Sequence, residues 1–494
     1  MCTALLCVLR AMLIFLREGV SVTARKNPIP LIALFILCLL AYFAPGGTAQ
    51  NTGGAINSGD TAWMIAASAL VLFMTPGLSF FYGGMVRQGN VISTMLQSYV
   101  CMGIVSLLWV LVGFSLAFGT SIQGLIGNPA TFFMFQGVSG ATEASLSPSI
   151  PFVLFALFQL KFAVITPALV TGAFAERVNF KSYLLFVSLF IVLIYAPLAH
   201  WTWHPEGILR KWGVLDFAGG TVVHMSAGFA ALAGAFFFGR RRGLSSDGHI
   251  PANIPYIILG TGMLWFGWFG FNAGSSLAAN ETAAMAFGTT HTASAAAALA
   301  WIAYDMIRGR KPSAVGFCIG AVVGLVAITP AAGFVSLGAS VVIGAVSAIV
   351  SHVVVDLKAK TSIDDTLDVF PCHGVGGVMG MIFTAIFAKD VGLVFGQTET
   401  FIKHLVALFG VAGFSFFGSY LLFKVVDLIS PLRVSEAEEA SGLDLSQHGE
   451  GTEAGKLIGG AEIDSLLAHL RSNGGQDTAG MTTPSTTTRT LSFL

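Results

Sequence analysis

The sequence predicts an all-α polytopic membrane protein with eleven transmembrane helices. Apolar residues make up 55% of its 494 residues and charged residues only 10%, which is too little charge to cover a soluble protein of this size. Long uncharged segments recur along the chain, and the 58 glycines are typical of helices that pack closely in lipid. A soluble enzyme and a secreted disulfide scaffold therefore fit poorly. Because Lys+Arg and Asp+Glu are balanced at 25 each, no basic face for nucleic acid is expected either.

The N-terminus has the three parts of a secretory signal peptide. Four basic residues lie within residues 1–27, an apolar run covers residues 28–44, and small residues follow up to Ala49. We expect cleavage after Ala49; the alternative is an uncleaved first helix. Both interpretations place residue 50 outside the cytoplasm, because the basic end stays inside.

Eleven further apolar segments follow. We expect them near residues 61–83, 94–118, 149–174, 182–200, 217–239, 254–275, 285–307, 313–330, 334–355, 373–388 and 403–428. If residue 50 is outside, an odd number of crossings leaves the C-terminus in the cytoplasm.

The charges of the loops support this orientation. Eleven Lys and Arg lie in loops predicted inside and four in loops predicted outside, which satisfies the positive-inside rule. The eleven are Arg87, Arg177, Lys181, Arg240, Arg241, Arg242, Arg308, Arg310, Lys311, Lys358 and Lys360. The four are Arg210, Lys211, Lys389 and Lys403.

A weak internal repeat links the fifth and tenth segments. The first opens with Asp216-Phe-Ala-Gly-Gly-Thr-Val-Val-His224 and the second with Asp368-Val-Phe-Pro-Cys-His373-Gly. A five-helix unit repeated in tandem must be inverted, because an odd number of crossings flips the second copy. We therefore expect two inverted five-helix repeats plus one helix, with the substrate site at their interface near the middle of the bilayer.

The chain divides into three predicted regions. Residues 1–49 form the signal peptide or N-terminal extension, residues 50–429 the transmembrane domain, and residues 430–494 a polar cytoplasmic tail. Residues 457–470 could form a short amphipathic helix, whereas the Thr-rich end cannot bury enough apolar surface to fold alone. No enzyme domain fits in this tail.

Ionisable groups inside apolar segments are functional candidates. His224 and His373 would meet if the repeats are inverted, and two facing imidazoles can share one proton. The alternative is two unrelated structural histidines. A metal site is disfavoured, because His291 and His352 lie in other segments and no metal-binding motif is present.

Several other polar and aromatic residues can be explained by structural roles. Asp216, and in the same way Asp368, precedes a helical run and could accept its free N–H groups as an N-cap. Lys161 interrupts the third segment and has no evident partner. Trp203 falls where the fourth segment meets the outside, where it fits either the interfacial aromatic belt or a cation-binding ring face.

The motifs of the fifth and tenth segments, taken with two others, resemble the ammonium transporter (Amt/Mep/Rh) family. The others are Trp268-Phe-Gly-Phe-Asn-Ala-Gly-Ser275 and Phe158-Gln-Leu-Lys-Phe162-Ala-Val-Ile-Thr-Pro, the latter followed by Gly172-Ala-Phe-Ala-Glu-Arg177. The resemblance runs from about residue 60 to 450, and it is closer to the Amt/Mep branch than to the Rh branch. His204-Pro-Glu-Gly departs from the glycine run that many members have at this position.

The resemblance implies a homotrimer with one pore through each subunit. It implies that Trp203, Phe162 and Ser275 form an outer vestibule for ammonium, whose shape depends on Asp216. Phe162 and Phe271 are then the gate, and His224 and His373 the twin histidines of the pore. No cofactor, metal or enzyme activity is implied, and the location is the inner (plasma) membrane as a multi-pass protein.

The function expected from this resemblance is ammonium transport for nitrogen uptake. Ammonium would be recruited at the vestibule and deprotonated, and ammonia would cross into the cytoplasm with or without the released proton. The alternatives are an ammonium sensor and a neutral channel for ammonia or carbon dioxide. Residues 432–450 are expected to dock on the cytoplasmic loops, where a PII-type nitrogen-regulatory protein is a further candidate partner.

Overall fold

The computed structural model of the protein describes residues 29–43, 52–242 and 250–451. The chain divides into two compact units, Met1–Pro45 and Gly46–Leu494. In the first unit the described part is one helix, α2, Ile29–Phe43. Most of the predicted signal peptide, including its cleavage site, and the predicted helix at residues 457–470 lie outside the described residues. Cleavage after Ala49 and the three regions therefore stay predictions.

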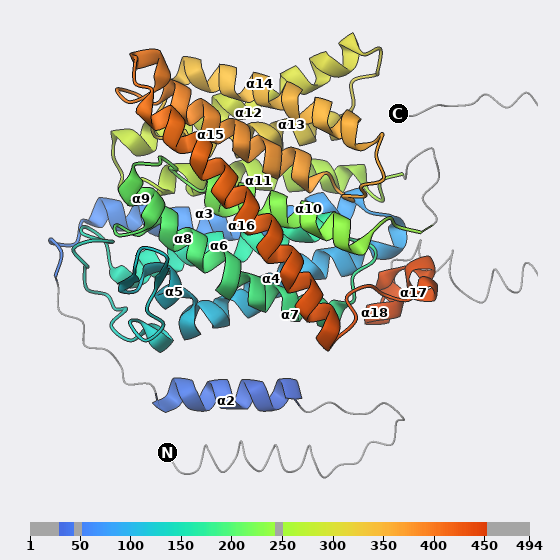
Figure 1. The fold of residues 1–494 in the computed structure, drawn as a ribbon, viewed down its shortest axis with the longest axis horizontal. Helices are drawn as coiled ribbons and strands as arrows, with labels where there is room; N and C mark the ends of the chain where they lie inside the picture. Colours follow the sequence, from blue (N-terminus) through green and yellow to red (C-terminus); the bar gives the residue numbers. More distant parts are fainter. Residues whose placement is uncertain (1–28, 44–51, 243–249, 452–494) are drawn as a thin grey trace, which may run out of the picture. The chain divides into compact units, whose positions relative to one another are not determined.

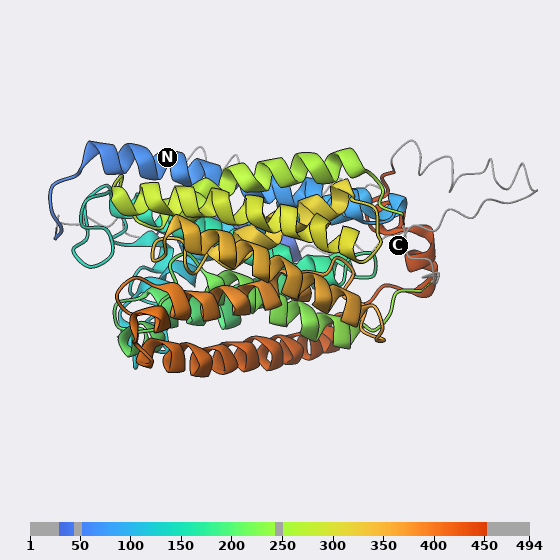
Figure 2. The same cartoon turned by 90° about the horizontal axis from the view of Figure 1, so that it is seen from above.

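The second unit is a bundle of long helices that run roughly side by side (Figures 1 and 2). Its α-helices are α3 Ser58–Met85, α4 Val91–Leu108, α5 Phe114–Phe118, α6 Phe152–Val170, α7 Phe180–Phe190, α8 Ala196–Trp203, α9 Ile208–Trp212, α10 Ser226–Phe238, α11 Ile254–Gly274, α12 Glu281–Ile307, α13 Ala314–Ile328, α14 Leu337–Lys358, α15 Gly376–Phe387, α16 Glu399–Ile429, α17 Glu436–Ser441 and α18 Leu443–His448.

Several helices contain or adjoin turns of other helical types. The π-helical segments are η2 Trp109–Gly113, η5 Ile191–Tyr195, η6 Gly220–Met225 and η7 Phe370–Val375. The 3-10 turns are η1 Gln88–Asn90, η3 Phe133–Phe135, η4 Thr171–Ala173 and η8 Leu393–Phe395. One short antiparallel strand pair, β1 Ser121–Ile122 with β2 Ile126–Gly127, departs from the all-α prediction.

The described helices fit a protein that crosses a membrane many times. Nine helical segments of the described chain are long and apolar enough to span a bilayer. All eleven segments expected from the sequence are helical, but α12 and the 15-residue α13 are not among these nine. The number of eleven crossings and the direction of the chain therefore stay predictions.

Polar side chains fix where several helices begin. Asn253, Asn280, Ser313 and Ser336 stand before α11, α12, α13 and α14, and each accepts a hydrogen bond from a backbone N–H in the first turn. Such caps satisfy donors that have no partner inside the helix. The sequence therefore marks the helix starts even though the helices themselves are nearly uniformly apolar.

Glycines let the helices approach one another closely. A Cβ placed on Gly260 of α11 would lie 2.4 Å from the backbone nitrogen of Phe81 in α3. A Cβ on Gly228 of α10 would lie only 2.1 Å from the backbone nitrogen of Gly374 in η7. The backbones of these two segments therefore touch, as small residues permit in membrane helices.

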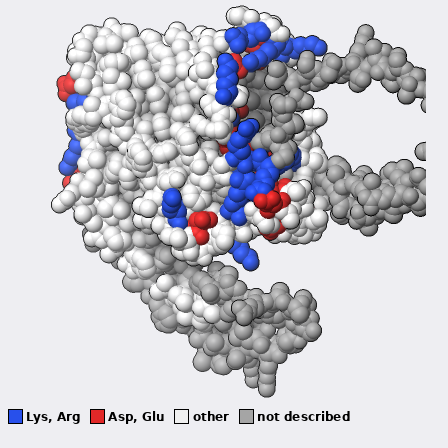
Figure 3. All heavy atoms as spheres, turned by 45° about the vertical axis from the view of Figure 1, so that its right-hand side comes forward, with Lys and Arg blue, Asp and Glu red and all other residues white. Residues whose placement is uncertain are grey.

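Ion pairs join the helix ends at the side of the bundle where α17 and α18 lie, here called the tail end (Figure 1). Buried Glu176 pairs with Arg87 at 2.7 Å and with Arg241 at 3.1 Å, and Arg241 also pairs with Asp364 at 2.9 Å. Burial opposes ionisation of Asp364, but hydrogen bonds from Arg241 and the charges of Arg177 and Arg241 lower its pKa to about 2. Figure 3 shows Lys and Arg gathered on this face.

The segment that follows α16 packs against the same helix ends, as predicted for residues 432–450. Asp444 Oδ1 accepts a hydrogen bond from the backbone N–H of Ser93 at 2.8 Å, in the first turn of α4. The backbone N–H of Leu443 donates to Asn90 Oδ1 at 2.9 Å. Leu443 is buried, whereas Leu445 is exposed.

Candidate functional site

An open cavity lies among the ends of α6, α8 and α11, away from the tail end. It contains the four residues predicted for the vestibule: Phe162, Trp203, Asp216 and Ser275. We call it the vestibule. Other polar residues that line it are Ser145, Gln159, Arg210, Ser276, Asn280 and Thr282. The sequence marks none of these six as a site residue.

Three predicted vestibule residues present suitable groups for a small cation. The rings of Phe162 and Trp203 pack edge to face, with centroids 5.6 Å apart and planes at 82°. The hydroxyl of Ser275 donates to the carbonyl of Phe271 at 2.9 Å, so its lone pairs remain as acceptors. Aromatic rings and a hydroxyl acceptor together suit an N–H cation.

The carboxylate of Asp216 holds the start of η6. Its two oxygens accept hydrogen bonds from the backbone N–H groups of Gly219 (2.8 Å), Gly220 (2.7 Å) and Thr221 (2.7 Å), and from the Thr221 hydroxyl. The capping role predicted for Asp216 is therefore confirmed. Because these donors occupy its lone pairs, the Asp216 carboxylate fixes the backbone beside the vestibule.

Two stacked phenylalanines separate the vestibule from an inner cavity. The ring centroids of Phe162 and Phe271 lie 4.1 Å apart with planes at 32°, and both side chains are buried. Phe162 lines the vestibule and Phe271 lines the inner cavity. The pair predicted to be a gate thus forms the partition between the two spaces.

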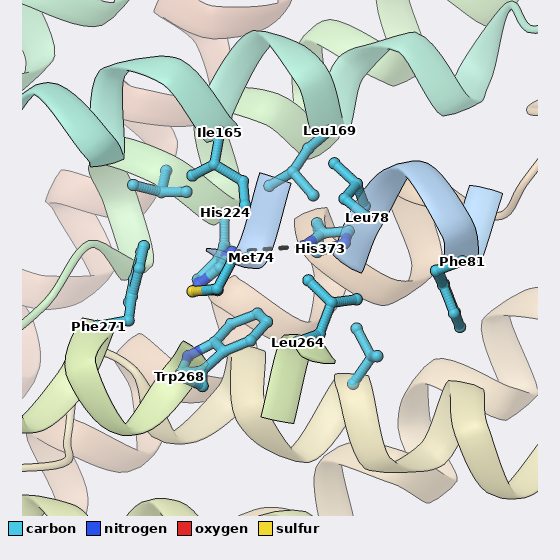
Figure 4. A pocket seen from close by; sticks show the side chains of 12 residues that line it. Met74, Leu78, Phe81, Ile165, Leu169, His224, Leu264, Trp268, Phe271 and His373 are labelled. Carbon is cyan, nitrogen blue, oxygen red and sulfur yellow. Dashed lines mark hydrogen bonds between the residues drawn. The ribbon is translucent and has the colours of Figure 1, made fainter. Parts of the chain in front are cut away.

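The inner cavity is a narrow apolar space (Figure 4). Nine of its lining side chains are hydrocarbon or thioether: Met74, Leu78, Phe81, Ile165, Leu169, Val223, Leu264, Phe271 and Val322. The other three are Trp268, His224 and His373. Histidine is therefore its one source of a basic nitrogen.

The two histidines come together, as the inverted-repeat argument predicted. Their Nδ1 atoms are 3.3 Å apart, which is the dashed contact in Figure 4. His224 lies on η6 and His373 on η7, so each stands on a π-helical turn. Such turns are rare and cluster at functional sites, and nothing in the apolar sequence marks them. The two histidines are therefore not unrelated, and a functional role for the pair stays a prediction.

Thr329 determines which nitrogens carry hydrogen in this pair. Its hydroxyl donates to the carbonyl of Leu325 at 2.7 Å and accepts from Trp268 Nε1 at 2.9 Å. The contact from Thr329 Oγ1 to His224 Nε2, at 3.3 Å, then requires His224 to donate. A neutral His224 consequently accepts at Nδ1, and His373 donates to it from its own Nδ1.

A third narrow cavity continues the inner one. It shares Phe81, Val322 and His373 with the inner cavity and adds Tyr82, Met85, Ile319, Leu367 and Cys372. Vestibule, inner cavity and third cavity therefore follow one another through the bundle. Lys161 is not among the residues that line these three spaces.

The capping role predicted for Asp368 is wrong, because the nearby Asp365 caps this helical segment instead. The first N–H groups of η7 are bound by Asp365, whose Oδ2 accepts from Phe370 at 2.7 Å, and not by Asp368. Asp368 has a φ of 56° and pairs instead with Lys358 at 2.5 Å. Asp365 precedes His373 by eight residues, as Asp216 precedes His224, so the corrected cap makes the two halves more alike.

The described residues contain no metal centre. Across residues 29–43, 52–242 and 250–451, no group of three or more His, Cys, Asp or Glu is arranged to hold a metal ion. His291 packs against Trp265, and His352 contacts Asp305 at 2.8 Å, both away from the histidine pair.

Comparisons with known proteins point to one family. The sequence profile of the Ammonium Transporter Family matches residues 62–453. An ammonium transporter of Aquifex aeolicus is 44% identical over 422 residues, covering 84% of this chain and 97% of that protein. An ammonium transporter of Bacillus subtilis is 45% identical over 403 residues, covering 79% and 98%.

Solved structures agree with the sequence matches. The crystal structure of Saccharomyces cerevisiae Mep2 superposes with a TM-score of 0.74 at 34% identity, covering 80% of this chain and 95% of that one. A structure titled Sensor Amt Protein superposes with a TM-score of 0.73 at 30% identity, covering 79% and 98%. At these identities and TM-scores the helical bundle is shared with these structures.

Proposed function

Since the chain belongs to the ammonium transporter family, we propose that it takes up ammonium across the plasma membrane. The observation that carries this proposal is the series of three spaces, in which an open vestibule is divided from a narrow histidine-lined cavity by two phenylalanines. Ammonium binds in the vestibule and loses a proton near Phe162 and Phe271. Ammonia then passes His224 and His373 into the cytoplasm.

Recognition in the vestibule depends on hydrogen bonding. Potassium has nearly the size of ammonium but has no N–H groups to donate. Ser275 Oγ supplies an acceptor, and Phe162 and Trp203 supply aromatic rings for the charge. This combination favours a cation that can both donate hydrogen bonds and contact a ring.

Deprotonation adds the stronger discrimination. A bare cation in the apolar inner cavity costs several kcal/mol or more, whereas neutral ammonia passes easily. The histidine nitrogens offer hydrogen bonds to ammonia in a space that is otherwise hydrocarbon. The released proton either returns to the water outside, which makes transport neutral, or passes along the histidines, which makes it electrogenic.

The proposed orientation places the vestibule outside and the tail end in the cytoplasm. Eleven helices then cross the membrane as two inverted repeats plus one, and the chain assembles as a homotrimer with a pore in each subunit. The Lys and Arg gathered at the tail end support this direction (Figure 3). A reporter that is active only outside the cytoplasm should be active after Gly137 and silent after Arg242; the reverse pattern would overturn this orientation.

The function is tested with the purified full-length protein in lipid vesicles. An ammonium gradient should produce a current or an internal pH change that an equal potassium gradient does not. His224→Ala and His373→Ala should each greatly reduce this flux or relax its selectivity while expression and assembly persist, because the cavity loses its paired imidazoles. Wild-type flux and selectivity in both variants would contradict the proposed pore.

An ammonium sensor is the second candidate, because one similar solved structure is titled Sensor Amt Protein. A sensor binds ammonium in the vestibule but needs no flux. The vesicle experiment separates the two functions: binding of ammonium without flux would favour the sensor. A neutral gas channel fits less well, because it has no use for the cation-binding groups of the vestibule.

A further inference from the structure

We propose that His352 is a proton-binding site that couples transport to the pH on the cytoplasmic side. His352 lies on α14, where its imidazole is buried between the carboxylates of Asp305, on α12, and Asp356, four residues further along α14. None of the three lines the vestibule, the inner cavity or the third cavity. The link to transport rests on the proposed function, whereas the proton site itself does not depend on it.

One ring nitrogen of His352 has a partner and the other faces an acid. Nε2 lies 2.8 Å from Asp305 Oδ1, and a carboxylate only accepts, so Nε2 carries a hydrogen and donates it. Nδ1 is buried, has no hydrogen-bond partner among the described residues, and lies 3.7 Å from Asp356 Oδ2. In a neutral imidazole this nitrogen is a second acceptor beside a carboxylate, which is unfavourable. A proton on Nδ1 changes this contact into an ion pair.

The charges around His352 are balanced only when its imidazole is protonated. Arg310 pairs with Asp356 at 2.8 Å and lies 3.6 Å from Asp305, so one guanidinium is shared by two carboxylates. α13, which packs against α12 and α14, contains no Asp, Glu, His, Lys or Arg. A neutral His352 therefore leaves two negative charges against one positive charge, and a protonated His352 supplies the second positive charge.

Aromatic side chains connect this cluster to the third cavity. The ring centroids of Trp301 and Tyr304 lie 4.4 Å and 4.8 Å from that of His352, within the range at which aromatic rings stabilise a cation. Trp301 belongs to the same buried apolar cluster as Cys372, which lies on η7 and lines the third cavity. A change in the charge of His352 can therefore reach the wall of that cavity through one packed cluster.

The direction of the coupling follows from the chemistry of ammonia. In neutral transport, ammonia that reaches the cytoplasm binds a proton there and becomes ammonium, so uptake raises the internal pH. Histidine ordinarily changes charge between about pH 5 and about pH 8. Loss of the proton from His352 removes its ion pair with Asp356, so the cluster holds α12 and α14 together less firmly beside η7. Flux should then fall as the internal pH rises, which limits uptake.

The first test measures the proton directly in purified full-length protein. The nitrogen NMR signals of His352, identified by their loss in His352→Gln, are followed from about pH 5 to about pH 8. Asp356→Asn removes the charge and keeps the size of the side chain, so it should lower the pH at which His352 loses its proton by about one pH unit. A neutral imidazole throughout this range would overturn the site. So would a titration that Asp356→Asn leaves unchanged.

The second test measures ammonium flux into vesicles while the internal pH is varied over the same range. Glutamine can still donate to Asp305 but cannot gain a charge, so His352→Gln shows only the effect of pH on the ammonium gradient. Between the two ends of the range, wild-type flux should fall about fivefold more than that of His352→Gln, the lower end of coupling between two sites. His291→Gln, which changes an exposed histidine of α12, is the control and should behave as the wild type.

The two measurements separate the inference from the proposed function. Equal pH dependence in the wild type and His352→Gln would overturn the coupling to transport. A wild type whose His352 titrates as expected but which transports no ammonium at any pH would overturn the proposed transport and leave the proton site in place.

Discussion

Thr329 connects the histidine pair to the aromatic wall of the inner cavity. Its single hydrogen is used by Leu325, so it can only accept from Trp268 and His224. This arrangement gives each ring of the pair one defined tautomer, with the free acceptor nitrogen on His373. Because this acceptor nitrogen has a fixed position, ammonia has one preferred place in the inner cavity to donate a hydrogen bond.

Thr329→Val should therefore slow ammonium transport without unfolding the protein. Valine has the shape of threonine but accepts nothing, so His224 is no longer held as a donor at Nε2. Thr329→Ser keeps the hydroxyl and should retain most of the flux. Vesicle flux and the nitrogen NMR shifts of the histidine side chains measure both effects. Unchanged shifts and flux in the valine variant would contradict the assignment of hydrogens.

Trp203→Leu should weaken capture at low ammonium and matter little at saturation. A cation–π contact of about 1 kcal/mol shifts the half-saturating concentration roughly fivefold. Uptake measured over a concentration series tests this, with Trp212→Leu, an exposed tryptophan of α9, as the control. An unchanged half-saturation in Trp203→Leu would leave the ring without a role in capture.

Single residues were predictable where the contact is local. Asp216 could be assigned as a cap because its donors lie three to five residues ahead. Thr329 could not be found, because its partners Trp268 and His224 stand 61 and 105 positions away. The sequence predicts Asp368 and not Asp365 as the cap before η7. The left-handed backbone at Asp368, which turns its side chain toward Lys358, leaves no mark in the sequence.

Among the elements, helix positions were predictable but internal irregularities were not. Uniformly apolar runs reveal a helix through length and hydropathy, so every expected segment is helical. The tenth was expected from residue 373, but the helical segment begins at Phe370 because Pro371 is tolerated in a first turn. The π-helical turns leave no trace in hydropathy, because an extra residue in an apolar run is again apolar.

Gly228→Ala should destabilise the protein and abolish transport. The new Cβ would meet the backbone nitrogen of Gly374, which cannot move without displacing η7 and His373. Gly262→Ala in α11 is the matched control, since nothing lies within 4 Å of a Cβ there. Replacing that glycine should be neutral or stabilise its helix by about 0.5–1 kcal/mol. Melting temperature and vesicle flux check both variants. A Gly228→Ala variant with the stability and flux of the wild type would contradict the close contact.

At the scale of the whole molecule, the segment after α16 ties together loops that are far apart in sequence. Asp444 binds the first turn of α4, and Glu439 accepts from the backbone N–H of Arg242 at 2.6 Å. A change in this segment can therefore reach the helices that form the cavities. The expected binding of a regulatory protein on this side stays a prediction.

Two truncations test whether this contact matters for transport. A chain ending after Glu450 keeps both short helices and the contacts of Asp444 and Glu439, so it should transport normally. A chain ending after Leu432 loses α17 and α18 and should transport poorly while still assembling. Vesicle flux and size-exclusion chromatography measure the two properties. Equal flux in both chains would show that the packed segment has no part in transport.

The backbone contact between Gly228 and Gly374 also bears on kinetics. A transporter that exposes its site alternately to the two sides must move one group of helices against another. Here the segments that carry the histidines touch without a side chain between them, so no deformable layer allows such sliding. The width of the passage is then fixed when the chain folds. We expect the turnover rate to depend on the occupancy of the vestibule and on the passage of ammonia through the inner cavity. No large conformational cycle is expected for each molecule that crosses.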